Sequence, residues 1–347
     1  MIFMKRRALA GHPRGRESSR YHHGVSTAEL HLEAPLLRTH ALPATAGHVL
    51  HVSEHGTAEG IPALLLHGGP GSGCSPLLRR FFDPRQFRII CLDQRGSGAS
   101  RPRGATQNNT TGDLLQDLHR LREHLGLARW LVVGGSWGAT LGLAHAAAEP
   151  GAVEALLLRA TFLARREDID GFFQGSSHED PLAWQRFASV APAEHRDALL
   201  PWLVRVMAGG ETALQARAAR AWWEWERLLS GASLPAEPPQ GEALAALVDR
   251  CRVQSHYMGH DCWLDKPPLL ERCRALPRVP TLLLHASNDR VCRPEGVKAL
   301  HAELPHSRLR WVEGAGHDPA HPAMARAMVA ALDRYAACRD FDGHATP

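Results

Sequence analysis

The sequence predicts an α/β fold in which a mostly parallel central sheet is flanked by helices, with a helical cap inserted into the chain. Short apolar runs typical of buried strands alternate with helical patterns, which favours a parallel sheet covered on both faces. Over residues 161–272 such runs are absent, and helical segments rich in tryptophan replace them. The predicted strands are residues 63–67, 87–93, 130–134, 153–158, 281–285 and 308–312.

Apolar residues at helical spacing fill the intervals between these strands. Leucines recur at this spacing over residues 114–125, after a polar start at 108–111 that can cap a helix. In the central segment, residues 218–229 have a helical pattern, and a proline-rich stretch at 235–239 interrupts it. We therefore expect a core of residues 36–160 and 273–340, a helical cap of residues 161–272, and a disordered basic extension of residues 1–35.

The charge distribution argues against a nucleic-acid-binding protein. The 347 residues carry a formal net charge of +4, but residues 1–20 alone contribute +5. A nucleic-acid-binding domain needs its basic residues clustered on the folded body. We therefore expect no nucleic-acid partner.

The distribution of apolar residues and cysteines predicts a cytoplasmic protein. No run approaches the roughly 20 apolar residues of a membrane span, and no apolar segment follows the basic N-terminus as in a secretory signal. The seven cysteines are odd in number and scattered, without a C-x-x-C pair. This favours free thiols in a reducing compartment over disulfides or a zinc site. We expect neither a membrane association nor a metal.

The motif Gly134–Gly135–Ser136–Trp137–Gly138 predicts a nucleophilic serine. It follows a predicted strand and precedes a helical pattern, the context in which G-x-S-x-G projects a serine hydroxyl from a tight turn. The alternative for the same pattern is a glycine-rich turn between a strand and a helix. The strand–turn–helix order favours Ser136 as the nucleophile of an α/β-hydrolase fold, with a mostly parallel sheet and an inserted cap.

The acid and the base of a catalytic triad follow in the order that this fold uses, which is Ser, Asp or Glu, then His. Asp289 follows the predicted strand at 281–285, and His317 follows the one at 308–312. Both lie beyond the carboxyl ends of strands, where such sheets place their sites. His321 is an alternative base, although prolines bracket it. Asp318 is expected to cap the following helix.

The segment His67–Gly68–Gly69–Pro70–Gly71 follows the first predicted strand and predicts one half of an oxyanion hole. Here the fold supplies one backbone N–H, and the N–H of the residue after the nucleophile, Trp137, supplies another. We assign Gly68, Gly69 and Trp137 to the oxyanion hole and expect His67 to be structural. A phosphate-binding loop is disfavoured because its Lys and Ser/Thr are absent.

Together with their neighbours, these motifs resemble the prolyl iminopeptidases, serine aminopeptidases of the α/β-hydrolase superfamily. The resemblance covers roughly residues 40–335 and also includes Asp93–Gln94–Arg95–Gly96–Ser97–Gly98, Asn109–Thr110–Thr111, Trp225–Glu226 and His256–Tyr257. It implies release of an N-terminal proline from small peptides with a free N-terminus, with Ser136, Asp289 and His317 as triad. It also implies that the enzyme uses no metal or organic cofactor.

The resemblance places substrate recognition in the cap. Glu226 would pair with the substrate amine, because a buried ammonium needs a partner charge. Gln254 stands where the family commonly has an acid, and Gly171 where it usually has a tryptophan. The pocket is therefore expected to be roomier, so that hydroxyproline, alanine or other small N-terminal residues compete with proline. The remaining substrate-binding residues by resemblance are Phe162, Phe172, Phe173 and Tyr257.

Two other interpretations stay open from the sequence. One is a broad esterase, amidase or C–C hydrolase on the same scaffold, favoured if Glu226 is dispensable. The other is a non-catalytic protein that keeps the fold, for which a triad member should have been lost. Cys292 and Cys262 predict sensitivity to thiol reagents, against the alternative that both are small buried hydrophobic residues.

Overall fold

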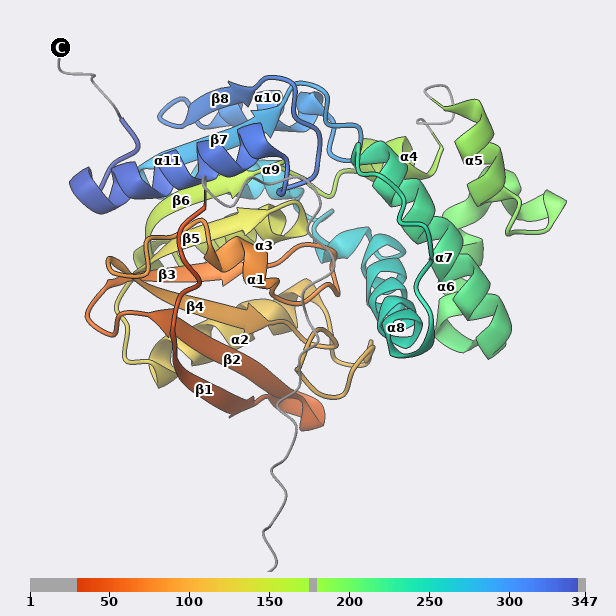
Figure 1. The fold of residues 1–347 in the computed structure, drawn as a ribbon, viewed down its shortest axis with the longest axis horizontal. Helices are drawn as coiled ribbons and strands as arrows, with labels where there is room; N and C mark the ends of the chain where they lie inside the picture. Colours follow the sequence, from red (N-terminus) through yellow and green to blue (C-terminus); the bar gives the residue numbers. More distant parts are fainter. Residues whose placement is uncertain (1–29, 175–179, 343–347) are drawn as a thin grey trace, which may run out of the picture.

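The computed structural model describes residues 30–174 and 180–342. The predicted extension of residues 1–35 lies outside the described residues as far as residue 29. It was drawn too long, because Leu30 and Ala34 are buried in the apolar core. The described chain forms an eight-stranded sheet with the order β1-β2-β4-β3-β5-β6-β7-β8 (Figure 1). Strands from β4 to β8 along this order are parallel, whereas β1–β2 and β2–β4 are antiparallel. The predicted α/β-hydrolase fold class is confirmed.

The six predicted strands correspond to the parallel part of the sheet. They are β3 (Ile61–Leu66), β4 (Phe87–Asp93), β5 (Trp130–Gly135), β6 (Val153–Arg159), β7 (Thr281–Ala286) and β8 (Arg308–Val312). The sequence did not predict β1 (Leu36–Pro43) or β2 (Val49–Gly56). These two strands lack the continuous apolar run on which the prediction relied, because most of β1 is exposed and β2 mixes apolar with polar residues.

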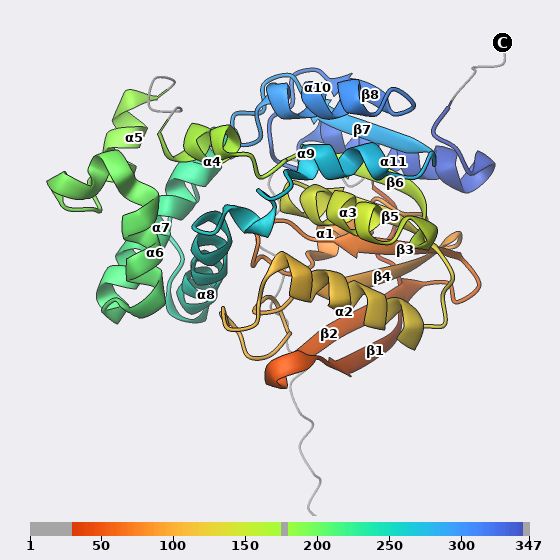
Figure 2. The ribbon, with the colours of Figure 1, turned by 180° about the vertical axis from the view of Figure 1, so that it is seen from behind.

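Helices cover both faces of the sheet, and alternate residues of each strand reach the two cores. In β3, Leu64 and Leu66 join one apolar cluster, whereas Ala63 and Leu65 join the other. The first face is covered by α2 (Thr111–His124), α3 (Trp137–Ala148), α9 (Leu269–Arg272) and α10 (Pro294–Glu303), as Figure 2 shows. The opposite face is covered by α1 (Pro76–Arg79) and α11 (Pro322–Cys338).

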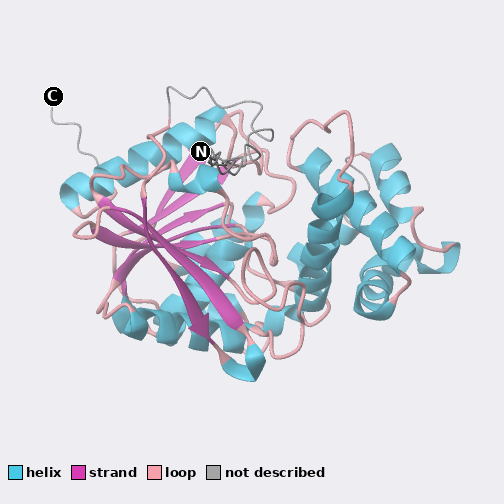
Figure 3. Cartoon of the chain, turned by 60° about the horizontal axis from the view of Figure 1, so that its bottom comes forward, coloured by secondary structure: helices cyan, strands magenta, loops and turns pink. Residues whose placement is uncertain are grey.

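The cap is a group of helices beside the sheet, on the side where the parallel strands end (Figures 1 and 3). Trp222 and Trp225 are buried among these helices, so the tryptophans of this segment form the core of the cap. The helices are α4 (Arg166–Phe173), α5 (Pro181–Ala188), α6 (Leu199–Gly209), α7 (Thr212–Leu229) and α8 (Gly241–Met258). Short 3-10 turns connect elements at Thr45–Gly47, Pro150–Ala152, Ala193–Ala198, Asp261–Trp263 and Cys273–Ala275.

The boundary between cap and core differs from the expected residue 272. Helix α9 packs against α3 and α10 and therefore belongs to the core, so the cap helices end with α8. The expected break at residues 235–239 falls in the loop between α7 and α8. No helix within residues 30–174 and 180–342 has the length and apolar character to cross a membrane.

Candidate active site

Ser136 occupies a sharp turn between β5 and α3. Its backbone has φ 57° and ψ −124°, a conformation that non-glycine residues rarely adopt and that marks stored strain. The neighbouring glycines are required because the backbones cross closely. A Cβ at Gly134 would lie 2.3 Å from the carbonyl oxygen of Gly138, and one at Gly138 would lie 2.2 Å from that of Leu66. The strand, turn and helix thus hold the Ser136 hydroxyl at the carboxyl edge of the sheet.

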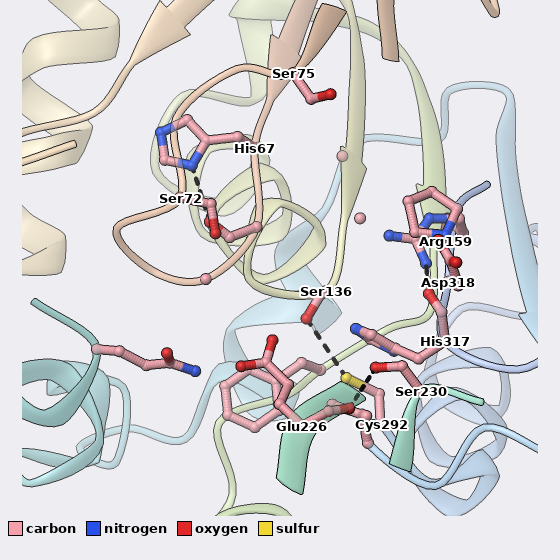
Figure 4. A pocket seen from close by; sticks show the side chains of 18 of the residues that line it. His67, Ser72, Ser75, Ser136, Arg159, Glu226, Ser230, Cys292, His317 and Asp318 are labelled. Atoms are coloured by element: carbon pink, nitrogen blue, oxygen red, sulfur yellow. Dashed lines mark hydrogen bonds between the residues drawn. The ribbon is translucent and has the colours of Figure 1, made fainter. Parts of the chain in front are cut away.

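Ser136 opens into a cavity of about 340 Å³ between the core and the cap. Figure 4 shows Ser136, Glu226, Cys292 and His317 around this cavity. The core contributes residues from the loops that follow β3, β5 and β7 and from the loop between β8 and α11. The cap contributes residues of α4, α7 and α8. A cavity of this size takes a small ligand.

Asp289 and His317 are brought together although 28 residues separate them. Nδ1 of His317 lies 2.8 Å from Oδ2 of Asp289, and Oδ1 of Asp289 accepts from the backbone N–H groups of Val291 and Cys292 at 3.0 and 2.8 Å. Burial opposes ionisation of Asp289, but His317 and these N–H groups outweigh it and lower the pKa of the carboxyl. The carboxylate therefore fixes the imidazole with Nε2 free for the cavity.

The charge of His317 is stabilised in the resting site. Burial disfavours the imidazolium, but the charge of Asp289 outweighs it and raises the pKa of His317 to about 10. No hydrogen bond joins Ser136 to His317 among the described residues. Instead, Ser136 Oγ lies 3.7 Å from Sγ of Cys292. In hydrolases without substrate the hydrogen bond between nucleophile and base is often long and tightens in the complex. A Ser136–His317 separation beyond hydrogen-bond distance is therefore compatible with the expected roles.

The glycine loop after β3 lies against the turn of Ser136. A Cβ at Gly68 would lie 3.7 Å from the Cβ of Ser136, so only a residue without a side chain leaves this space to a substrate. Gly68 and Gly69 both line the cavity, and the N–H of Trp137 begins α3 directly after Ser136. His67 holds the loop, because its Nε2 accepts from the backbone N–H of Gln94 at 3.1 Å.

Arg159 is a residue of the site that sequence reasoning missed. It ends β6 with its side chain buried, and its Nη1 donates to the backbone oxygen of His317 at 2.8 Å. A Cβ at Gly135 would lie 2.5 Å from the same guanidinium, so Arg159 fills the space between the Ser136 turn and the His317 loop. The sequence signal that could have found it is a charged residue at the end of an apolar predicted strand.

Part of the predicted substrate pocket is present in the cavity. Phe162, Phe172 and Phe173 form an apolar wall, and the backbone oxygen of Phe172 accepts from the indole N–H of Trp225 at 3.2 Å. Glu226 on α7 and Gln254 on α8 also line the cavity. Glu226 pairs with Arg250 of α8, a partner that the sequence reasoning missed.

Tyr257 is not brought to the cavity. Its hydroxyl donates to Oδ1 of Asn109 at 2.9 Å, and its ring packs against Trp137, so it fastens α8 to the core. It is not among the residues that line the cavity, because its side chain is buried between α8 and the core. Gly171 also faces elsewhere, since a Cβ there would meet the guanidinium of Arg293 at 3.6 Å.

The alternatives to His317 have other places. His321 is the residue before α11 and lies outside the cavity, so it does not replace His317 there. Asp318 lines the cavity, and its Oδ1 accepts from the N–H of Ala320 at 2.8 Å. It closes the turn before α11 rather than capping the helix itself. Among the described residues, no three His, Cys, Asp or Glu side chains gather as a metal site.

Comparisons with known proteins agree with this arrangement. Residues 62–321 match the family model of the alpha/beta hydrolase fold. A probable proline iminopeptidase of Leptolyngbya boryana is 37% identical over 302 residues, which cover 85% of this chain and 93% of the relative. A proline iminopeptidase of Xylella fastidiosa is 36% identical, covering 83% and 93%, and one of Arabidopsis thaliana is 34% identical, covering 83% and 77%.

Solved structures share the fold at low sequence identity. A proline iminopeptidase-related protein from Thermus thermophilus has a TM-score of 0.53 at 21% identity, with 86% of this chain and 97% of that chain covered. A haloalkane dehalogenase variant from Bradyrhizobium elkanii has a TM-score of 0.58 at 20% identity, with 89% and 99% covered. Enzymes of different chemistry thus share this scaffold, so the activity must be argued from the site.

Proposed function

The chain belongs to the proline iminopeptidase family of α/β hydrolases, and on that premise we propose that it is a serine aminopeptidase releasing N-terminal proline from peptides. The observation that carries the proposal is Glu226, a carboxylate that lines the same cavity as Ser136 and an apolar wall of phenylalanines. An N-terminal proline presents an amine, an apolar ring and a carbonyl in the corresponding order.

We propose Ser136, Asp289 and His317 as the catalytic triad. Ser136 Oγ attacks the carbonyl carbon of the first residue while Nε2 of His317 takes the hydroxyl proton. The N–H groups of the Gly68–Gly69 loop and of Trp137 stabilise the negative oxygen of the tetrahedral intermediate. His317 then gives the proton to the leaving nitrogen, the peptide bond breaks, and a prolyl ester of Ser136 remains. Water, activated by His317, hydrolyses this ester and releases proline.

The cap sets the exopeptidase character in this proposal. The pyrrolidine ring lies against Phe162, Phe172 and Phe173, and the amine meets Glu226. A free N-terminus is required in this proposal because Glu226 binds the amine itself. Alanine and hydroxyproline also fit the cavity and are the competing small residues. The substrates are then small peptides, and the unpaired state of all seven cysteines favours a cytoplasmic location.

A panel of aminoacyl β-naphthylamides tests the activity. We expect the proline derivative among the best substrates, with no release by Ser136→Ala. Tyr257→Phe is a matched control, because Tyr257 lies outside the cavity and keeps its ring. Rapid cleavage of simple acyl esters with no cleavage of any aminoacyl amide would overturn the peptidase assignment. The broad esterase would then be the remaining assignment.

A further inference from the structure

The carboxylate proposed to receive the substrate amine already has a cationic partner. Arg250 on α8 contacts Glu226 on α7 through its Nη2, and the two side chains are about equally exposed, at 21% and 22%. Burial disfavours the charge of Arg250, but Glu226 outweighs it and raises the pKa of the guanidinium. Both residues line the cavity of Ser136. The pair therefore enters any complex with net charge zero.

One helical turn after Arg250, Gln254 adds a neutral polar group to the same wall. Gln254 is 7% exposed, and its buried Oε1 has no hydrogen-bond partner. An amide oxygen accepts a hydrogen bond but supplies no negative charge. A substrate N–H placed between Glu226 and Gln254 would satisfy this oxygen. A positively charged amine between Glu226 and Gln254 would have no carboxylate of its own, because Glu226 is already paired with Arg250.

The other charged groups around the cavity do not change this balance. Asp168 of α4 is bound by Arg165 at 2.6 Å, and His317 is paired with Asp289. Arg227, next to Glu226, points to the backbone oxygen of Ser233 and to the ring of Trp223. The remaining titratable or charged side chains at the cavity are His67, Arg159, Cys292 and Asp318, which belong to the core.

We propose that Arg250 is a specificity-determining residue that neutralises Glu226, so that the enzyme binds the N-terminal amine of its substrate in the uncharged form. This inference rests on the proposed function and specifies the state of the substrate. An ammonium beside Glu226 would also lie near the guanidinium of Arg250, and juxtaposed like charges in an interface cost several kcal/mol. An uncharged amine instead donates its N–H to Glu226 or Gln254 without this repulsion.

Competitive inhibition tests the proposal without requiring amide cleavage. Hydrolysis of a p-nitrophenyl ester is measured with two inhibitors, L-prolinamide and its uncharged carbocyclic analogue cyclopentanecarboxamide. The ratio of their inhibition constants isolates the amine, because the effects of pH on the enzyme itself act on both ligands. The pH is varied across the pKa of an α-amino group, which is about 8.

For the wild type we expect prolinamide to bind at least about tenfold tighter, relative to the analogue, above the amine pKa than below it. In Arg250→Met the free carboxylate favours the ammonium, so the dependence reverses and binding below the amine pKa tightens by at least about tenfold. Arg252→Met is the matched control, because Arg252 lies on the same helix but pairs with Asp249 away from the cavity. It should behave like the wild type.

Gln254→Glu is a second variant if Arg250→Met does not fold. It adds a carboxylate beside the pair, and we expect it to tighten binding of the charged amine. The inference is overturned if wild-type enzyme prefers the charged amine and neither variant changes the ratio. A different result, no inhibition by prolinamide at any pH in any variant, overturns the proposed amine recognition together with this inference.

Discussion

The thiol of Cys292 lies 3.7 Å from the hydroxyl of Ser136, and the same residue follows Asp289 in the loop after β7. Burial raises the pKa of this thiol above its ordinary value, so it is protonated at neutral pH. It therefore occupies the space between the proposed nucleophile and the His317 loop without competing as a nucleophile. Any group attached to its sulfur would fill that space.

A mercurial reagent should therefore inactivate the enzyme through Cys292. We expect loss of ester and amide hydrolysis in the wild type, and Cys292→Ala should stay active and resist the reagent. The exposed Cys338 provides the control, since Cys338→Ala should remain sensitive. Equal inactivation of Cys292→Ala would assign the effect to another thiol.

The pH dependence should reflect the stabilised charge of His317. An imidazole accepts the proton of Ser136 only when neutral, and against the opposing effect of burial the charge of Asp289 raises the pKa of His317 to about 10. Hence kcat/KM should rise with pH above the ordinary histidine range near 6.5, measured with an uncharged ester.

Removal of the charge of Asp289 tests the cause of this shift. Asp289→Asn should move the rising limb to lower pH, because the imidazolium loses its partner, while kcat falls by up to about 10⁴-fold. A limb that keeps its position in Asp289→Asn would contradict the assignment of His317 as the titrating base.

Glu226→Gln should weaken binding of substrates with a free amine. The variant removes the carboxylate and leaves the charge of Arg250 without its partner, so KM for prolyl amides should rise by about tenfold or more. Hydrolysis of an ester without an amine serves as the control and should change little. An unchanged KM for the prolyl amide would remove Glu226 from amine recognition.

Arg159 should act as a positioning residue. Arg159→Met loses the bond to the backbone oxygen of His317, and misplacement of a catalytic group by about 1 Å can cost about 10²-fold in rate. We expect kcat to fall with KM nearly constant, and Arg159→Lys to recover part of the loss. A proportional change in KM would point to a general disturbance of the cavity instead.

The buried ion pair between Arg95 and Asp117 should dominate the stability of the loop after β4. Two short hydrogen bonds of 2.6 and 2.8 Å join the side chains, both fully buried. Asp117→Ala leaves the buried guanidinium with Asp113, at 3.5 Å, as its remaining carboxylate partner, and should lower the unfolding free energy by about 3 kcal/mol in denaturant titrations.

Arg120→Ala is the matched control for this pair. Arg120 contacts Asp117 at 3.4 Å from a partly exposed position, so its loss should cost at most about 1 kcal/mol. Similar losses for both variants would show that burial of the Arg95 pair contributes little.

The sequence predicted those parts of the molecule that depend on local pattern. Apolar runs located the parallel strands β3 to β7, because a strand buried on both faces has no polar side. The edge strand β8 was located although Arg308 and Arg310 interrupt its apolar residues. The order of strand, glycine turn and helix located Ser136, and the positions after β7 and β8 located Asp289 and His317. Strands β1 and β2 escaped prediction because most of β1 is exposed and β2 mixes apolar with polar residues.

Only the tertiary structure determined which side chains meet in the cap. Glu226 and Arg250 lie 24 residues apart on separate helices, and no spacing along the chain requires them to touch. Likewise Tyr257 and Gln254 are three residues apart on α8 and share one side of the helix, yet packing against the core places one at Asn109 and the other at the cavity. Sequence periodicity determines which segments form helices and strands, whereas the packing of those helices determines which side chains meet. In the cap, that packing pairs Glu226 with Arg250 and so determines the net charge at the proposed amine-binding site.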